Sequence, residues 1–144
     1  MKNAVKLRYG LVARIIPIVI VLCSTHLLEA AGFLGASYED CVADFGQPVT
    51  HDYGFGGDMY TFEKNEWRYG VVFQDRVVAS IMYMKIDSSP VGLTDVQLIK
   101  DVYSDGLGWL EQGKKLVRSD HQVYLESRLT AVLVYTRAFR RSAR

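Results

Sequence analysis

Cys41, His51 and Asp52 together carry the groups of a cysteine hydrolase, namely a thiol, a base and an orienting acid. The thiol, however, belongs to an apolar stripe with Val42 and Phe45, at the spacing of one helix face. Burial raises the pKa of a thiol and leaves it unreactive. We therefore expect Cys41 to be a small core residue and assign it no catalytic role. Pairing of this cysteine between two chains stays an open alternative.

Beyond residue 31 the chain has two histidines, each next to an aspartate, as His51-Asp52 and Asp120-His121. A metal site or a hydrolytic centre would need both pairs to meet in space. Both pairs fall in expected turns or loops, where aspartate commonly bonds to the nearby backbone. We predict no catalytic residue, no metal and no cofactor. The alternative is a small exported hydrolase that uses these pairs or acidic residues such as Glu63, Glu66, Asp101 and Asp105.

Residues 51–58 place three glycines and two aromatic residues within eight positions, which predicts a loop. Tyr53 and Phe55 have no periodic reason to be buried there, and aromatic side chains on loops frequently anchor protein interfaces. We predict a partner-binding site at Tyr53, Gly54, Phe55 and Gly56. The alternative is that both rings fold back over the sheet. The segment lacks the Lys-Ser/Thr of a phosphate-binding loop, so a nucleotide role is not expected.

A short helix is expected over residues 38–45. Ser37 is a good N-cap, and Asp40 stands at the return position of a capping box. Gly46 ends the helix as a left-handed cap, and Pro48 prevents the helix from resuming. This helix would place Cys41 on its buried side.

The rest of the chain predicts one further helix and two meanders. Thr94 caps the second helix, and Asp105-Gly106 ends it. Residues 107–112 are expected to form a connector. Alternation and β-branched residues predict strands at 59–64, 67–74, 77–85, 115–119, 122–128 and 129–137. The order helix–β–β–β–helix–β–β–β predicts an α+β fold with two short helices packed on antiparallel β-meanders.

The first thirty residues are typical of an export signal. A basic start without acids is followed by nine apolar residues at 15–23 and a polar stretch that ends in Ala30. Nine residues rise only about 14 Å as a helix, roughly half the hydrocarbon core of a bilayer. We predict a signal peptide at 1–30, a single globular domain at 31–136 and a basic tail at 137–144. The protein would be periplasmic or secreted, with a membrane tether through an uncleaved signal as the alternative.

The net charge of +1 conceals an asymmetry between the two parts of the chain. Residues 31–111 carry thirteen acidic and five basic residues, a net charge of −8, whereas residues 112–144 carry two acidic and eight basic residues, a net charge of +6. The tail 137–144 has four arginines and no acid. It could contact an anionic membrane or cell-wall polymer, but we expect a solvated, frayed terminus. No nucleic-acid partner is expected for an exported protein.

A capped helix that ends in Phe-Gly-Gln-Pro at 45–48 is followed by a meander with Val-Phe-Gln-Asp-Arg-Val-Val at 72–78. This run, about a third of the chain, resembles the outer-membrane assembly lipoprotein family and the related β-lactamase-inhibitor-protein-like fold. Arg76 stands where those families have glycine, and the lipoprotein cysteine motif is missing. The resemblance implies a module that binds other proteins and carries over no functional residue. We therefore predict an exported, non-catalytic module that binds another exported or envelope protein.

Overall fold

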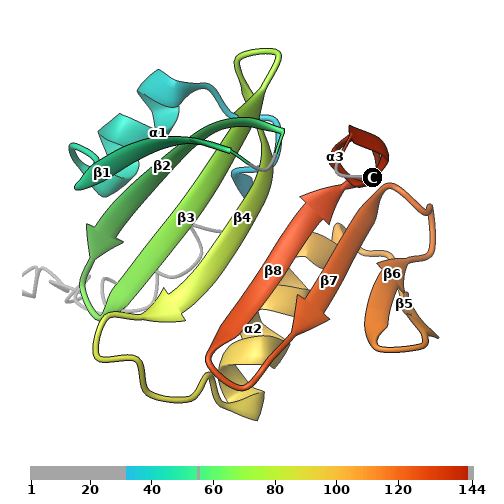
Figure 1. Ribbon diagram of the computed structural model, residues 1–144. Helices are drawn as coiled ribbons and strands as arrows, with labels where there is room; N and C mark the ends of the chain where they lie inside the picture. The colour runs from blue at the N-terminus through green and yellow to red at the C-terminus, as the bar shows by residue number, and fades with distance from the viewer. Residues whose placement is uncertain (1–31, 55, 143–144) are drawn as a thin grey trace, which may run out of the picture.

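The computed structural model describes residues 32–54 and 56–142 (Figure 1). The predicted signal at 1–30 and Phe55 lie outside the described residues. Eight strands form one antiparallel sheet in the order β1-β2-β3-β4-β8-β7-β6-β5. The elements are α1 (Tyr38–Phe45), β1 (Thr50–Gly54), β2 (Gly57–Lys64), β3 (Trp67–Gln74), β4 (Val77–Lys85), α2 (Leu93–Ser104), β5 (Trp109–Gln112), β6 (Lys115–Arg118), β7 (Val123–Ser127), β8 (Ala131–Thr136) and α3 (Arg137–Ser142).

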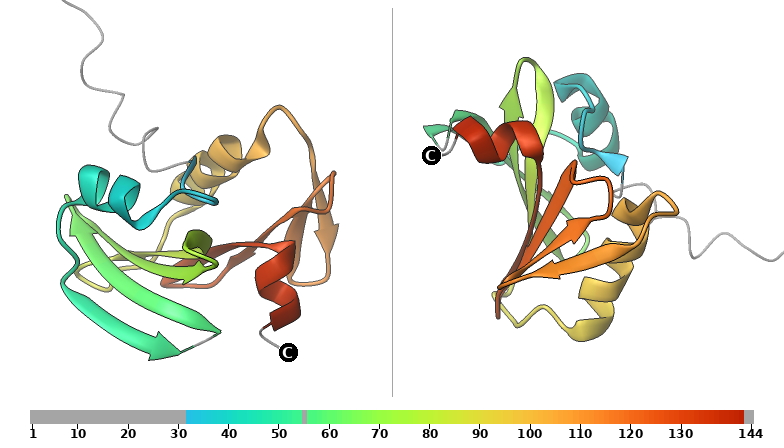
Figure 2. Two further views of the ribbon diagram at one scale, coloured as in Figure 1. Left: turned by 90° about the horizontal axis from the view of Figure 1, so that it is seen from above. Right: turned by 90° about the vertical axis from the view of Figure 1, so that its right-hand side faces the viewer.

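The predicted α+β class with antiparallel strands is confirmed, but the predicted element order is not. Each half has a fourth strand, and a third helix follows the last strand, so the order is α–β–β–β–β–α–β–β–β–β–α. The two halves meet at the centre of the sheet, where β4 pairs with β8 from Ser80↔Tyr135 to Met84↔Ala131. This central pairing joins two four-stranded meanders into one continuous sheet (Figure 2).

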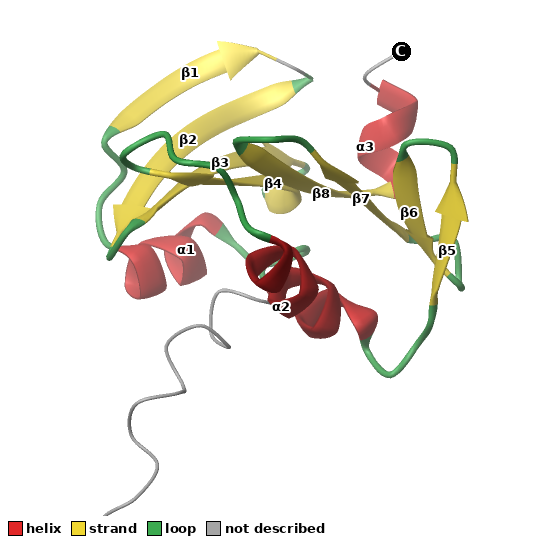
Figure 3. Ribbon diagram, turned by 90° about the horizontal axis from the view of Figure 1, so that it is seen from below, coloured by secondary structure: helices red, strands yellow, loops and turns green. Residues whose placement is uncertain are grey.

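Helices α1 and α2 lie on one face of the sheet, and α3 lies on the opposite face (Figure 3). The larger core fills the space between α1, α2 and the sheet. Its aromatic centre includes Phe45, whose ring stacks on Tyr69 at a centroid distance of 4.4 Å, and the fully buried Phe62. The aromatic residues that share one parity on β3, Trp67, Tyr69 and Phe73, all belong to this core.

Helix α1 begins as the sequence predicts. Ser37 Oγ accepts the backbone N–H of Asp40 at 3.1 Å, and Asp40 Oδ2 accepts the backbone N–H of Ser37 at 3.0 Å. Gly46 ends the helix with a φ of 87°, a value that glycine adopts without strain. The ψ of −167° places Gly46 outside the left-handed helical region that the sequence predicted for the cap.

Ser37→Ala is expected to lower the free energy of unfolding by about 1 kcal/mol, because it leaves an N-terminal N–H of α1 without its acceptor. Urea unfolding of the variant measures this loss. Ser119→Ala is the control, since Ser119 is an exposed turn residue with no side-chain hydrogen bond among the described residues. Equal stability of the two variants would contradict a capping role.

The loop predicted at 51–58 and the connector predicted at 107–112 both contain edge strands. β1 pairs with β2 from Thr50↔Thr61 to Gly54↔Gly57, and β5 pairs with β6 from Trp109↔Arg118 to Gln112↔Lys115. Most side chains of both strands are exposed. An edge strand is held by backbone hydrogen bonds to its neighbour, so no apolar alternation marks it in the sequence.

Helix α2 starts two residues earlier than predicted, with Gly92 in the N-cap position in place of Thr94. The carboxylate of Asp95 accepts the backbone N–H of Gly92 at 3.1 Å, so the capping acid reaches back from inside the helix. The predicted end at Asp105 is confirmed, since Asp105 adopts a left-handed conformation there. A hydrogen bond of 2.8 Å between the buried hydroxyls of Tyr103 and Tyr83 ties α2 to the sheet.

The basic tail is not frayed over residues 137–142, where it forms α3. Phe139 is buried, and its ring lies 6.0 Å from that of Tyr135. The backbone N–H of Arg137 donates to the carbonyl of Gln122 at 2.9 Å. One aromatic residue among arginines is a weak sequence signal, but it anchors the helix on the face that α1 and α2 leave uncovered.

Candidate functional site

The face of the sheet opposite α1 and α2 carries an apolar groove of about 410 Å³. Successive side chains of a strand point to opposite faces of a sheet. The residues that alternate with the core aromatics therefore point to this face. The groove is lined by Met59, Gly70, Val72, Ser80, Met82, Glu126, Arg128, Ala131, Leu133 and Phe139. These residues come from β2, β3, β4, β7, β8 and α3 and from the β7–β8 turn, so the groove crosses the junction between the two halves.

Gly70 and Met82 are directly opposed on β3 and β4. Because Gly70 has no side chain, a hollow lies above the middle of the sheet. A Cβ placed there would lie 3.5 Å from Met82 Cε, an ordinary contact, so the site has room for a side chain. Met82 and Met59 supply flexible, polarisable walls, which adapt to the shape of a bound group.

The charged residues of the groove lining, Glu126 and Arg128, differ in their pairing. Glu126 accepts the hydroxyl hydrogen of Tyr135 at 2.6 Å and lies 3.6 Å from Lys115 Nζ. Arg128 is exposed and makes no ion pair with any described residue. The groove therefore offers apolar walls with one unneutralised cation.

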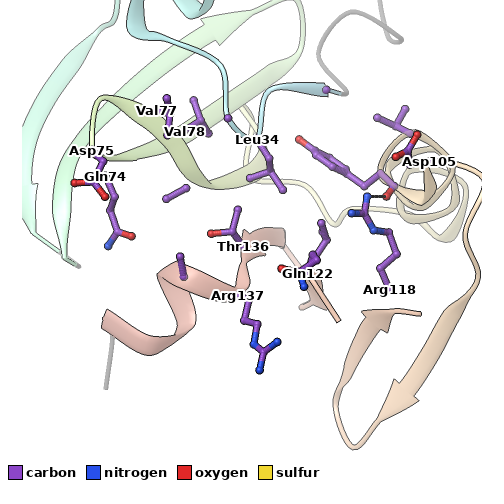
Figure 4. A pocket seen from close by; sticks show the side chains of 17 residues that line it. Leu34, Gln74, Asp75, Val77, Val78, Asp105, Arg118, Gln122, Thr136 and Arg137 are labelled. Atoms are coloured by element: carbon purple, nitrogen blue, oxygen red, sulfur yellow. Dashed lines mark hydrogen bonds between the residues drawn. The ribbon is translucent and has the colours of Figure 1, made fainter. Parts of the chain in front are cut away.

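A second hollow, of about 600 Å³, lies between the β3–β4 turn, the end of α2 and the start of α3 (Figure 4). Asp75, Asp105, Arg118 and Arg137 are its charged lining residues. The guanidinium group of Arg118 already has protein partners. It donates two hydrogen bonds to the Asp120 carboxylate, at 2.7 Å and 3.0 Å, and one to the Tyr103 carbonyl at 3.1 Å. Among the described residues, no three His, Cys, Asp or Glu side chains come together to hold a metal ion.

The prediction that Cys41 is a buried core residue is confirmed. Its side chain is fully buried on α1. Burial, with a smaller contribution from the charges of Asp40 and Asp44, raises the pKa of its thiol to about 12. The thiol is therefore neutral at physiological pH and is not the nucleophile of a hydrolase.

The two His-Asp pairs do not meet. His51 lies on the edge strand β1, where its ring stacks on Tyr60 at 4.1 Å and its Nε2 lies 3.4 Å from Asp58 Oδ1 rather than near Asp52. His121 lies in the turn between β6 and β7, on the other side of the central β4–β8 pair. The acidic residues considered for a hydrolase also have local partners. Glu63 forms an ion pair with Arg68, Glu66 forms one with Lys85, and Asp101 accepts a hydrogen bond from Gln97.

The predicted partner-binding residues lie at the β1–β2 hairpin. Tyr53 is 85% exposed, and Gly54 pairs with Gly57 at the end of the ladder. Gly56 has a φ of 86° in the turn, and Phe55 lies outside the described residues. Tyr53 shares a strand face with His51, whose partner Tyr60 contacts α1, so its side chain points away from the groove. The binding role of this hairpin stays a prediction.

The hairpin and the basic tail, more than eighty residues apart, are joined by one side chain. Gln74 Nε2 donates to the Gly56 carbonyl at 2.9 Å and to Ser142 Oγ at 2.7 Å. The turn of the hairpin and the end of α3 therefore lie together at one end of β3. The sequence did not predict this contact, because no local pattern in either segment indicates which distant segment it will contact.

Comparison with known proteins places this chain in no family: no family model matches it, and no curated protein is similar to it. A cysteine-rich secretory protein from Staphylococcus aureus is 14% identical over 74% of this chain and 45% of its own, with a TM-score of 0.44. A DUF4309 family protein from Bacillus subtilis is 15% identical over 78% of this chain and 91% of its own, with a TM-score of 0.42. An extracellular protein with an SCP domain from Bacillus anthracis is 15% identical over 73% of this chain and 44% of its own, with a TM-score of 0.40.

The matched part of this chain spans less than half the length of two of those three structures. Similarity at this level supports no statement about function. Within the described residues, no helix has both the length and the apolar character needed to cross a membrane. The candidate site is therefore defined by the geometry of the sheet alone.

Sequence reasoning missed the groove. Its residues alternate with the aromatic residues that were assigned to the core, and they are too few on each strand to form a pattern. Gly70 was the available signal, because a glycine inside a strand often marks a close approach or a missing side chain. The sequence predicted the two meanders but not the β4–β8 pairing that brings the two sides of the groove together.

Proposed function

We propose that this protein is an exported, non-catalytic module that captures another exported protein through the groove on the helix-free face of its sheet. The observation that supports this proposal is an apolar hollow walled by Met59 and Met82, with the charged residues Glu126 and Arg128 also in its lining. Apolar patches rimmed by polar residues typically mark interaction sites, and methionine and arginine are enriched at protein interfaces.

The partner would insert apolar side chains into the hollow above Gly70. Arg128, which has no ion pair among the described residues, would then face an acidic or carbonyl group of the partner. Tyr53, whose side chain points away from the groove, is a separate candidate anchor for a partner. The experiment must therefore distinguish the groove from the hairpin.

Gly70→Phe is expected to abolish partner capture, because its ring would occupy the hollow. Gly70→Ala is the matched control, since its Cβ makes only an ordinary contact and leaves most of the groove open. Capture of one partner from an envelope or culture extract, identified by mass spectrometry, is the measurement. We expect the same protein with wild type, Gly70→Ala and Tyr53→Ala, and its loss with Gly70→Phe.

Thermal unfolding of all four proteins checks that Gly70→Phe remains folded. Undiminished capture by a folded Gly70→Phe variant would contradict the groove as the binding site. Loss of capture only with Tyr53→Ala would transfer the site to the hairpin predicted from the sequence.

A further inference from the structure

Three arginines of α3 line a small hollow next to Tyr124. The hollow measures about 250 Å³ and is lined by Tyr124, Arg137, Arg140 and Arg141. The spacing i, i+3, i+4 places the three guanidinium groups on one side of the helix. Phe139, on the other side, is buried against the sheet. The sequence predicted a basic tail, whereas α3 places these three arginines around one hollow.

The base of this hollow is held in place by packing. Tyr124 is buried and stacks on Tyr135 at 5.4 Å with an interplanar angle of 11°. The guanidinium carbon of Arg140 lies 4.8 Å from the centre of the Tyr124 ring, within the range of a cation–π contact. One of the three cations is therefore oriented before any ligand arrives.

These arginines have no anion of their own within the described residues. The acids of the basic segment 112–144 are Asp120 and Glu126. Asp120 is bound to Arg118, and Glu126 to Lys115 and the Tyr135 hydroxyl. No ion pair between described residues includes Arg137, Arg140 or Arg141. Three uncompensated cations around one hollow repel each other unless an external anion binds.

We propose that the hollow formed by Tyr124, Arg137, Arg140 and Arg141 binds the phosphate group of an anionic ligand. Guanidinium forks match the oxygens of phosphate and carboxylate, and each binds two oxygens at a time. Three guanidinium groups around one hollow can use more acceptor oxygens and more negative charge than one carboxylate provides, and a phosphate group supplies both. This site lies apart from the hollow above Gly70 and does not depend on the proposed protein capture.

The test is a titration of the full chain with inorganic phosphate at low ionic strength, followed by NMR of the arginine side-chain N–H groups. We expect saturable shifts of the three α3 arginines. Arg137→Gln/Arg141→Gln should weaken phosphate binding about tenfold or more, because hydrogen bonds between charged groups are lost. Arg76→Gln/Lys114→Gln is the control, since it removes the same charge from two exposed residues outside the hollow.

Sedimentation with phosphatidylcholine vesicles, with and without phosphatidylglycerol, identifies the source of the phosphate. Binding to the anionic vesicles that is lost in the arginine double variant, but kept in the control, would assign a lipid headgroup. Phosphate binding without vesicle binding would assign a soluble phosphate-bearing ligand. Equal weakening by both double variants, or no saturable phosphate binding, would overturn the proposal. Gly70→Phe should bind phosphate normally, which separates this site from the groove.

Discussion

Gly57→Ala is expected to destabilise the protein by about 3 kcal/mol, as overpacking at a site that cannot relax does. A Cβ on Gly57 would clash with the carbonyl oxygen of Phe73 and would lie 3.2 Å from Val72 Cγ1. The obstructing atom is backbone in the neighbouring strand β3, so no side-chain rotation can relieve the contact. The end of β2 would have to move away from β3 and carry the β1–β2 hairpin with it.

The control for this substitution is the residue directly across the hairpin. Gly54 pairs with Gly57, but a Cβ on Gly54 meets no atom within 4 Å. Gly54→Ala should therefore leave stability unchanged or raise it slightly, because alanine restricts the unfolded chain. Urea unfolding of both variants measures the difference. Equal effects at the two positions would show that β2 does not approach β3 as closely as the structure has it.

Raising the pH from 9 to 12 is expected to destabilise the protein by several kcal/mol. Burial raises the pKa of the Cys41 thiol from 9.0 to about 12 and that of Tyr69 from 10.0 to about 12. Burial also raises the pKa values of Tyr83 and Tyr103 at the α2–sheet contact. One pKa unit corresponds to about 1.4 kcal/mol, and each state is half titrated at its own pKa, so Cys41 alone contributes on the order of 3 kcal/mol over this range.

The sign follows from the protons that each state holds. Between pH 9 and pH 12 the unfolded chain releases protons that the folded chain keeps on buried thiol and phenol groups. The free energy of unfolding therefore falls as the pH rises through this window, and the contribution is fully present below pH 9. Urea unfolding at successive pH values measures the slope. Tyr69→Phe and Cys41→Ala should each make it shallower, and a constant stability up to pH 12 would contradict the burial of these groups.

The two proposed sites differ in how far the sequence pointed to them. The excess of arginine near the C-terminus was visible, and its use as an anion contact was one interpretation of it. The gathering of Arg137, Arg140 and Arg141 beside Tyr124 was not visible, because it depends on Phe139 docking on the sheet. The groove had no visible pattern beyond Gly70. Its walls come from six different elements and one turn, and their pairing is a property of the whole sheet.

Local signals in the sequence determined those helices and strands, such as α1, β3 and β4, whose own residues carry a cap or an apolar pattern. The capping box of Ser37 and Asp40 set the start of α1, and alternation in β3 and β4 set their exact bounds of 67–74 and 77–85. These elements are short-range, since hydrogen bonds a few residues apart and a regular apolar face are sufficient to define them. The α+β class followed from the same signals.

Only the tertiary structure decided which elements lie side by side beyond the two predicted meanders. Edge strands β1 and β5 form because a neighbouring strand offers unpaired backbone groups, and the chain's own residues there are mostly exposed. The β4–β8 pairing joins residues about fifty positions apart, and no local pattern selects it. Such contacts depend on the packing of every element at once, which is why the groove and the arginine hollow appear only in the folded protein.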